Sequence, residues 1–157
     1  MLKGETEEIQ KKLYKAIQDR DGKKAAESFQ FFDTICGATQ ERQDALYEML
    51  KLEMDILLVV GGYNSSNTTH LVEIGQKKIP SFFIRDAKCL ESFEQILHFD
   101  LENKIEKRTY SGNYFNASSP ITIGITAGAS CPNNLIEKTI LRIFQIRGHD
   151  TSELHSD

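Results

Sequence analysis

The sequence has 157 residues, enough for one ordinary domain or for a domain with part of another. Its formal net charge of −4 provides no basic stripe, which excludes a nucleic-acid reader. The longest apolar run, residues 56–60, is far shorter than the about 20 residues that cross a bilayer, so no membrane span is expected.

The first part of the chain predicts one helix and one strand. Apolar residues recur at helical spacing over residues 5–20, which is typical of an amphipathic helix. Residues 29–32, Phe-Gln-Phe-Phe, then favour a strand that runs into Asp33–Cys36. A helix that starts so early in the chain suggests that further residues precede Met1. The N-terminal residues resemble neither a signal peptide nor a transit peptide.

From residue 40 onward helices and strands alternate. The predicted elements are a helix with Ala45, Leu46, Met49 and Leu50 on one face, a strand at 55–60, a helix bearing Leu71, Val72 and Ile74, strands at 80–84 and 121–125, and a last helix from Pro132 that buries Ile136, Ile140, Ile143 and Phe144. After Asp55, the strand at 55–60 is continuously apolar, as in strands covered on both faces. This alternation predicts an α/β fold with a parallel sheet flanked by helices. Residues 86–119 break the rhythm and predict a connecting helix followed by a loop or hairpin.

Three polar clusters follow predicted strands, at residues 33–40, 64–67 and 126–132. In open α/β sheets, ligands bind beyond the carboxyl ends of the strands. We therefore expect the three clusters to open on the same edge of the sheet.

Two of these clusters predict anion sites at helix starts. Ser65, Ser66 and Asn67 follow a Gly pair and begin a helix, where backbone N–H groups point outward. Ser130 is predicted to cap the last helix, with Pro132 in its first turn. Plain capping of a helix, without any ligand, is the alternative for each of these residues.

The remaining cluster contains Cys36, which could be a nucleophile, a metal ligand or an inert core residue. Thiolate clusters usually need three or four converging cysteines, and in this chain only Cys36 is in a convincing position for one. The three cysteines are widely spaced and odd in number, which favours a reducing compartment over a disulfide framework. The residues alone thus predict a phosphate- or carboxylate-binding α/β domain with an isolated cysteine nearby.

Three segments carry a family resemblance: Asp33–Asp44 (DTICGATQERQD), Val60–Thr68 (VGGYNSSNT) and Gly124–Ser130 (GITAGAS). In this order they resemble the 4-hydroxy-3-methylbut-2-enyl diphosphate reductase family, also called IspH or LytB, of the methylerythritol phosphate pathway of isoprenoid biosynthesis. The amino-acid sequences of residues 1–6 and 39–44 are similar to those of the plant and cyanobacterial branch of this family. The resemblance covers residues 1–147.

The resemblance implies a fold of three similar α/β domains around an iron–sulfur cluster. This chain would hold about one and a third of them. Residues 1–32 would be a remnant of the second domain, residues 33–147 the third domain, and residues 148–157 a disordered tail.

The resemblance also implies roles for individual residues. Cys36 would be one of three cysteine ligands of a 4Fe-4S cluster, with one iron left open for substrate. Ser65, Ser66, Asn67 and Ser130 would bind the substrate's diphosphate. With two electrons from ferredoxin or flavodoxin and two protons, the family removes the allylic hydroxyl and gives isopentenyl and dimethylallyl diphosphates.

The chain departs from the family pattern in several ways. The other two cluster cysteines, the substrate-binding histidines and the proton-donating glutamate precede the part that corresponds to Met1. No catalytic residue is therefore expected here, and the chain alone is expected to be inactive. Cys131 stands where Thr or Ala is common, and Gly37 stands where a larger residue is usual.

Partners and location follow from the same resemblance. The missing N-terminal half is one expected partner, and the location would be the plastid stroma in a plant or alga and otherwise the cytoplasm. No targeting peptide is recognised within these residues. The alternative function is a non-catalytic anion-binding or interaction module derived from the enzyme.

Overall fold

The computed structural model describes residues 11–13, 15, 16, 19, 37–112, 114, 115 and 120–151. The chain divides into two compact units, residues 1–41 and 42–157. The described residues before Gly37 are all helical, in agreement with the helix predicted at 5–20. The strand predicted at 29–32 lies outside the described residues. Within the described part, no helix has the length and apolar character to cross a membrane.

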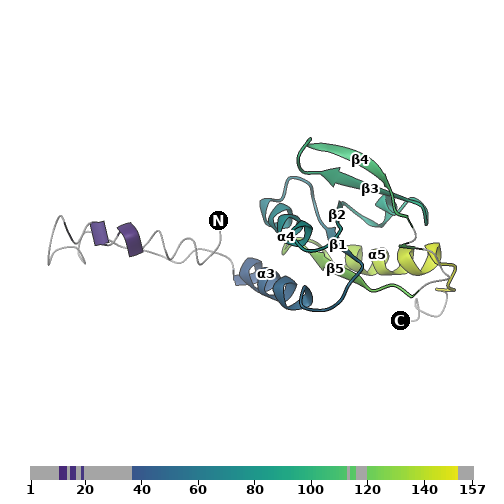
Figure 1. The fold of residues 1–157 in the computed structure, drawn as a ribbon, viewed down its shortest axis with the longest axis horizontal. Helices are drawn as coiled ribbons and strands as arrows, with labels where there is room; N and C mark the ends of the chain where they lie inside the picture. Colours follow the sequence, from purple (N-terminus) through teal and green to yellow (C-terminus); the bar gives the residue numbers. More distant parts are fainter. Residues whose placement is uncertain are drawn as a thin grey trace. The chain divides into compact units, whose positions relative to one another are not determined.

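A three-stranded parallel sheet with strand order β2-β1-β5 forms the centre of the second unit (Figure 1). The elements in chain order are α3 (Gly37–Met49), β1 (Ile56–Val60), α4 (Ser66–Gln76), β2 (Ser81–Ile84), η2 (Ala87–Cys89), β3 (Gln95–Asp100), β4 (Ile105–Tyr110), β5 (Ile123–Ala127) and α5 (Asn133–Ile146). Leu58 of β1 is in register with Phe82 of β2 and Ile125 of β5. The predicted parallel sheet flanked by helices is confirmed.

The central strand β1 separates two hydrophobic clusters, because alternate side chains of a strand point to opposite faces. All five of its residues are fully buried. One face packs in a cluster with Ile143 of α5, and the other in a cluster with Leu46 of α3 and Leu71 of α4. Each fully buried side chain of this size contributes roughly 1.5–3 kcal/mol to folding. The central strand is thereby packed between α5 on one face and α3 and α4 on the other.

An antiparallel hairpin, β3–β4, follows β2 and lies on the β2 side of the sheet (Figure 1). The predicted hairpin is confirmed, whereas the predicted connecting helix is only the single turn η2, capped by Asp86. The guanidinium of Arg142 on α5 donates to the carbonyl oxygens of Leu90 at 3.0 Å and Glu91 at 2.9 Å. These bonds tie the base of the hairpin to the last helix.

Two helix faces differ from their predictions. On α3, Ala45 is exposed, and Gln43 is buried beside Leu46 in its place. On α5, Ile143 is buried as expected, but Ile140 is 39% exposed and Phe144 42% exposed. Among the described strands, β5 pairs only with β1, so these two side chains lie along an unpaired strand edge instead of over a sheet.

The end of the described chain folds back on α5. Gly148 has a positive φ of 76°, a left-handed conformation that favours glycine after a helix. The ring of His149 then meets the ring of Phe144 edge-on at 5.7 Å, and Thr151 is buried. Residues 152–157 of the predicted tail lie outside the described residues.

Candidate functional site

Two of the three predicted polar clusters lie side by side at the carboxyl edge of the sheet. They follow β1 and β5, which are adjacent parallel strands. The N–H of Gly128 donates to the carbonyl oxygen of Val60 at 3.2 Å, and a Cβ placed on Gly128 would lie 3.8 Å from Ser65 Oγ. Of the remaining cluster at 33–40, residues 33–36 lie outside the described residues, and Cys36 is among them.

The turn after β1 ends in a capped helix. Ser65 is the N-cap of α4, and its Oγ accepts hydrogen bonds from the Thr68 N–H at 3.3 Å and from the Thr68 hydroxyl at 2.9 Å. Ser66 and Asn67 are exposed and occupy the first two helical positions. Helix starts carry outward N–H groups and the positive end of the helix dipole. Capping by Ser65 and an anion site at the same helix start are therefore compatible.

The turn after β5 is built differently from its prediction. Ser130 is not the N-cap, because α5 begins at Asn133 and Pro132 occupies the cap position. The N–H of Cys131 donates to the Gly128 carbonyl at 2.9 Å, which closes a turn and leaves Ser130 exposed at its tip. Within the described residues, no side chain caps α5. Its first N–H groups can thus receive a ligand.

Thr68 lies between the two turns and is 1% exposed. A Cβ on Gly61 would come within 2.8 Å of the Thr68 Oγ1, and a Cβ on Gly128 within 2.1 Å. Both positions need glycine because the threonine hydroxyl occupies the space that a side chain would fill. Packing of this kind joins the ends of β1 and β5.

The hairpin supports the turn after β1 through Tyr63. The Tyr63 ring stacks on Phe99 of β3, with centroids 4.7 Å apart and planes at 20°, and meets Phe83 of β2 edge-on at 5.1 Å. The Arg85 guanidinium lies 5.8 Å from the Tyr63 ring centroid. Burial raises the pKa of Tyr63 well above its usual value, and the nearby Cys89 thiol adds to this. Tyr63 therefore stays protonated, and its ring packs the turn after β1 against the hairpin.

Two arginines lie near this edge of the sheet. Arg85 is the first residue after β2 and pairs with Asp86 at 3.4 Å and Glu106 at 3.5 Å. The hydrogen bond to Asp86 and the charge of Glu106 raise the pKa of Arg85, so it remains charged.

Burial raises the pKa of the Cys131 thiol, and the positive charge of Arg42 on α3 partly opposes this shift. The electrostatic effect of Arg42 extends to the turn after β5.

Sequence reasoning missed Thr68, Tyr63, Arg85 and Arg42 as parts of this edge. A signal for Arg85 was available, because it directly follows the predicted strand at 80–84 and so lies at a carboxyl end. The stacking of Tyr63 on Phe99 joins residues far apart in the chain, and no local pattern predicts it.

A metal cluster is not supported by the described residues. Among them, no group of three or more His, Cys, Asp or Glu side chains could hold a metal ion. Cys89 is buried 3.7 Å from the Tyr63 hydroxyl, and Cys131 is partly buried next to the start of α5. The described part of the chain therefore does not fit an iron–sulfur cluster by itself.

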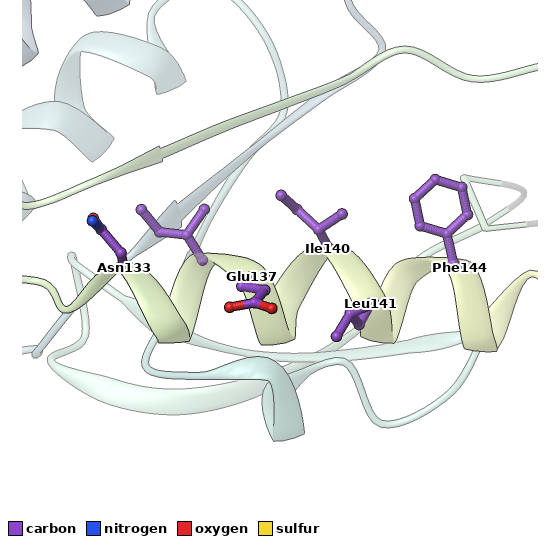
Figure 2. Close-up of a pocket in the computed structure, with 6 residues that line it drawn as sticks. Asn133, Glu137, Ile140, Leu141 and Phe144 are labelled. Atoms are coloured by element: carbon purple, nitrogen blue, oxygen red, sulfur yellow. The ribbon is translucent and has the colours of Figure 1, made fainter. Parts of the chain in front are cut away.

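An apolar groove along α5 is a separate feature (Figure 2). Its volume is about 530 Å³, and Figure 2 shows Ile140 and Phe144 extending from the same side of the helix. A second groove, of about 390 Å³, lies between α5 and β5. Ile140 and Phe144 line both. A diphosphate needs polar donors, so these grooves do not suit it.

The fold and the sheet edge define an α/β domain with paired helix starts suited to an anion. The model of the LytB protein family matches residues 1–144. The chain belongs to this family, which confirms the resemblance of its three segments.

The relatives agree with this assignment. The chain is 47% identical over 150 residues to the 4-hydroxy-3-methylbut-2-enyl diphosphate reductase of Gloeobacter violaceus, covering 94% of this chain and 35% of the relative. It is 40% identical over 160 residues to the chloroplastic reductase of Botryococcus braunii, covering 94% of this chain and 30% of the relative. The chain thus spans about a third of the length of these curated relatives.

A solved structure supports the same α/β fold. It is the structure of (E)-4-hydroxy-3-methyl-but-2-enyl diphosphate reductase, described as the terminal enzyme of the non-mevalonate pathway. The TM-score is 0.50 at 29% identity, and the match covers 72% of this chain and 32% of that one.

Proposed function

We propose that this chain is the diphosphate-binding part of an enzyme that reduces 4-hydroxy-3-methylbut-2-enyl diphosphate. The observation that carries the proposal is that the turn bearing Ser65 and the turn bearing Ser130 adjoin at one sheet edge. The names of the relatives supply the substrate, since the geometry alone supports only an anion.

In this proposal, four residues hold the diphosphate. Ser65, Ser66 and Ser130 donate their hydroxyls, Asn67 donates its amide, and the first N–H groups of α4 and α5 point at the same oxygens. Hydrogen bonds to a charged acceptor contribute about 1.5–3 kcal/mol each. The diphosphate end of the substrate would be fixed, and the allylic end would be left for chemistry elsewhere.

The proposed reaction consumes two electrons and two protons. The allylic C–O bond breaks, a C–H bond forms, the hydroxyl leaves as water, and the products are isopentenyl and dimethylallyl diphosphates. Ferredoxin or flavodoxin would supply the electrons. Cys36 is proposed as one ligand of the 4Fe-4S cluster, whose other ligands would come from the part of the relatives that this chain does not span.

Domain limits and location belong to the same proposal. Residues 1–32 would complete a preceding domain and residues 33–147 would form the diphosphate-binding domain. The relatives include cyanobacterial enzymes and a chloroplastic one, so the plastid stroma is proposed for a plant or algal source and the cytoplasm otherwise.

Calorimetry with inorganic diphosphate tests the binding site. We expect saturable binding by the wild-type chain and a loss of affinity of about tenfold in Ser130→Ala, from one charged hydrogen bond. Absence of binding by the wild type would contradict the proposal and favour the interaction module, to which the grooves beside Ile140 and Phe144 are suited.

A separate experiment tests the cluster. The chain is incubated anaerobically with iron and sulfide, and the bound iron is measured after gel filtration. We expect substoichiometric iron, because one proposed thiolate cannot replace three or four. Four irons per chain in a monomeric fraction would show that the chain assembles the cluster without the rest of the enzyme.

A further inference from the structure

The side chain of Thr68 meets both polar turns, yet binding of the diphosphate as proposed gives it no role. It is the third residue of α4 and is 1% exposed. Its hydroxyl fills the space beside Gly61, which follows β1, and beside Gly128, which follows β5. The Thr68 side chain is therefore packed between the two turns, in addition to the backbone hydrogen bond from the Gly128 N–H to the Val60 carbonyl.

The hydrogen bonds of Thr68 also decide what the hydroxyl of Ser65 can do. A serine hydroxyl has one proton to donate and two lone pairs that accept. Ser65 Oγ accepts from the N–H of Thr68 at 3.3 Å and from its hydroxyl at 2.9 Å. Both lone pairs are then occupied, and the Ser65 proton remains for another partner. A diphosphate oxygen accepts hydrogen bonds and so matches a hydroxyl committed to donate.

We infer that Thr68 is a positioning residue for the anion. Through Ser65 it fixes a hydroxyl donor toward the diphosphate, and through its contacts with Gly61 and Gly128 it sets the spacing of the two turns. The inference rests on the proposed function, because it needs an anion at this edge. Thr68 itself does not touch the ligand.

The test is calorimetry with inorganic diphosphate on the whole chain. Thr68→Val keeps the shape of the side chain and removes the hydroxyl, and we expect its affinity to fall about tenfold, as for a lost hydrogen bond to a charged group. Thr68→Ser restores the hydroxyl and should bind within about twofold of the wild type. If Thr68→Ser restores the affinity, the loss in Thr68→Val is due to the missing hydroxyl and not to changed packing.

Thr139→Val is the matched control. Thr139 is fully buried, and its hydroxyl donates to the Leu135 carbonyl at 2.7 Å inside α5. Its loss should lower the melting temperature as much as Thr68→Val does, but leave the affinity for diphosphate unchanged. If Thr68→Val does not fold, Thr68→Ala removes the same hydroxyl without the extra methyl and takes its place.

A double-mutant cycle identifies the route of the effect. If Thr68 acts through Ser65, Thr68→Val should change affinity by less than about twofold in a Ser65→Ala background. Equal affinities of Thr68→Val and Thr139→Val, with binding by the wild type, would overturn this inference and leave the proposed function standing. A wild type that does not bind diphosphate would overturn both.

Discussion

Side chains from α4 and the hairpin hold the turn after β1, whereas backbone hydrogen bonds contribute more to the turn after β5. Ser65 caps α4, Thr68 packs beneath it, and Tyr63 stacks on the hairpin. The turn bearing Ser130 has the Cys131 N–H bond to the Gly128 carbonyl, and no side-chain cap on α5 among the described residues. Substitutions in the first turn should therefore affect both stability and binding, and those at the tip of the second mainly binding.

The largest effect is expected from a substitution that forces the two turns apart. In Gly128→Ala the new Cβ would come within 2.1 Å of the Thr68 Oγ1, a contact that the buried threonine cannot relieve without moving. We expect a loss of about 3 kcal/mol in the free energy of unfolding, measured with urea, as for overpacking of a core. Diphosphate affinity should fall with it.

Gly62→Ala is the control for that substitution. No described atom lies within 4 Å of a Cβ placed on Gly62, and its φ is not positive. The free energy of unfolding should stay within about 0.5 kcal/mol of the wild type. An equal loss in the two variants would show that glycine is needed at both positions for backbone reasons, and that the space beside Thr68 is not decisive.

The hairpin offers a second test. Phe99→Ala removes the ring on which Tyr63 stacks, and we expect a loss of about 2 kcal/mol in the free energy of unfolding, because Phe99 is only partly buried. Diphosphate affinity should also fall several-fold as the turn after β1 loses its support. Phe93→Ala, on an exposed side chain just before the hairpin, should change neither quantity. Unchanged affinity in Phe99→Ala would mean that the hairpin does not position the turn.

Two serine variants compare the turns directly. Ser65→Ala removes an N-cap and should cost about 1 kcal/mol in the free energy of unfolding as well as diphosphate affinity. Ser130→Ala alters an exposed turn tip and should lower affinity while the free energy of unfolding stays within about 0.5 kcal/mol. Urea unfolding and calorimetry on the same samples give both numbers. A larger stability loss in Ser130→Ala than in Ser65→Ala would reverse the comparison.

The smallest expected effect is a pH dependence in the hairpin. Burial lowers the pKa of His98, with the charge of Lys107 acting in the same direction and the Phe99 backbone and Asp100 opposing it. The stability that comes from neutral His98 is present above its unfolded pKa of about 6.5 and is lost as the pH falls through the lower folded pKa. Its ring Nε2 lies 2.7 Å from the Thr109 hydroxyl, a contact between β3 and β4.

His98→Gln removes the ionisable group and keeps a polar side chain. The free energy of unfolding of the wild type should fall more steeply than that of the variant between pH 7 and pH 5, a window around the unfolded pKa of about 6.5. Parallel curves for the two proteins would show that His98 titrates as in the unfolded chain.

Hydrophobic pattern was enough to predict the centre of the fold. The apolar part of the strand predicted at 55–60 is β1, whose five residues are all buried, and α4 buries Leu71, Val72 and Ile74 as expected. The last helix was predicted with too wide a buried face. The pattern cannot show that β5 is unpaired on its outer side among the described strands, which leaves Ile140 and Phe144 exposed.

The positions of the two polar turns at one sheet edge were predictable, and their internal structure was less so. The rule that ligands bind beyond the carboxyl ends of strands located Ser65 and Ser130, because it depends only on strand direction. The cap of α5 was misplaced by two residues, since the turn closed by the Cys131 N–H delays the helix start to Asn133. The contacts of Thr68 with two glycines depend on tertiary packing, which no local motif reports.

The close packing of Gly61, Thr68 and Gly128 also limits which amino-acid substitutions these three positions can accept in evolution. A side chain at either glycine would need a smaller residue than threonine at position 68, because the Thr68 hydroxyl already fills the gap. The three positions should then co-vary across homologues, with alanine at one of the outer positions accompanied by glycine or alanine in the middle. Such a pair would keep the strand ends together at the expense of the bond to Ser65.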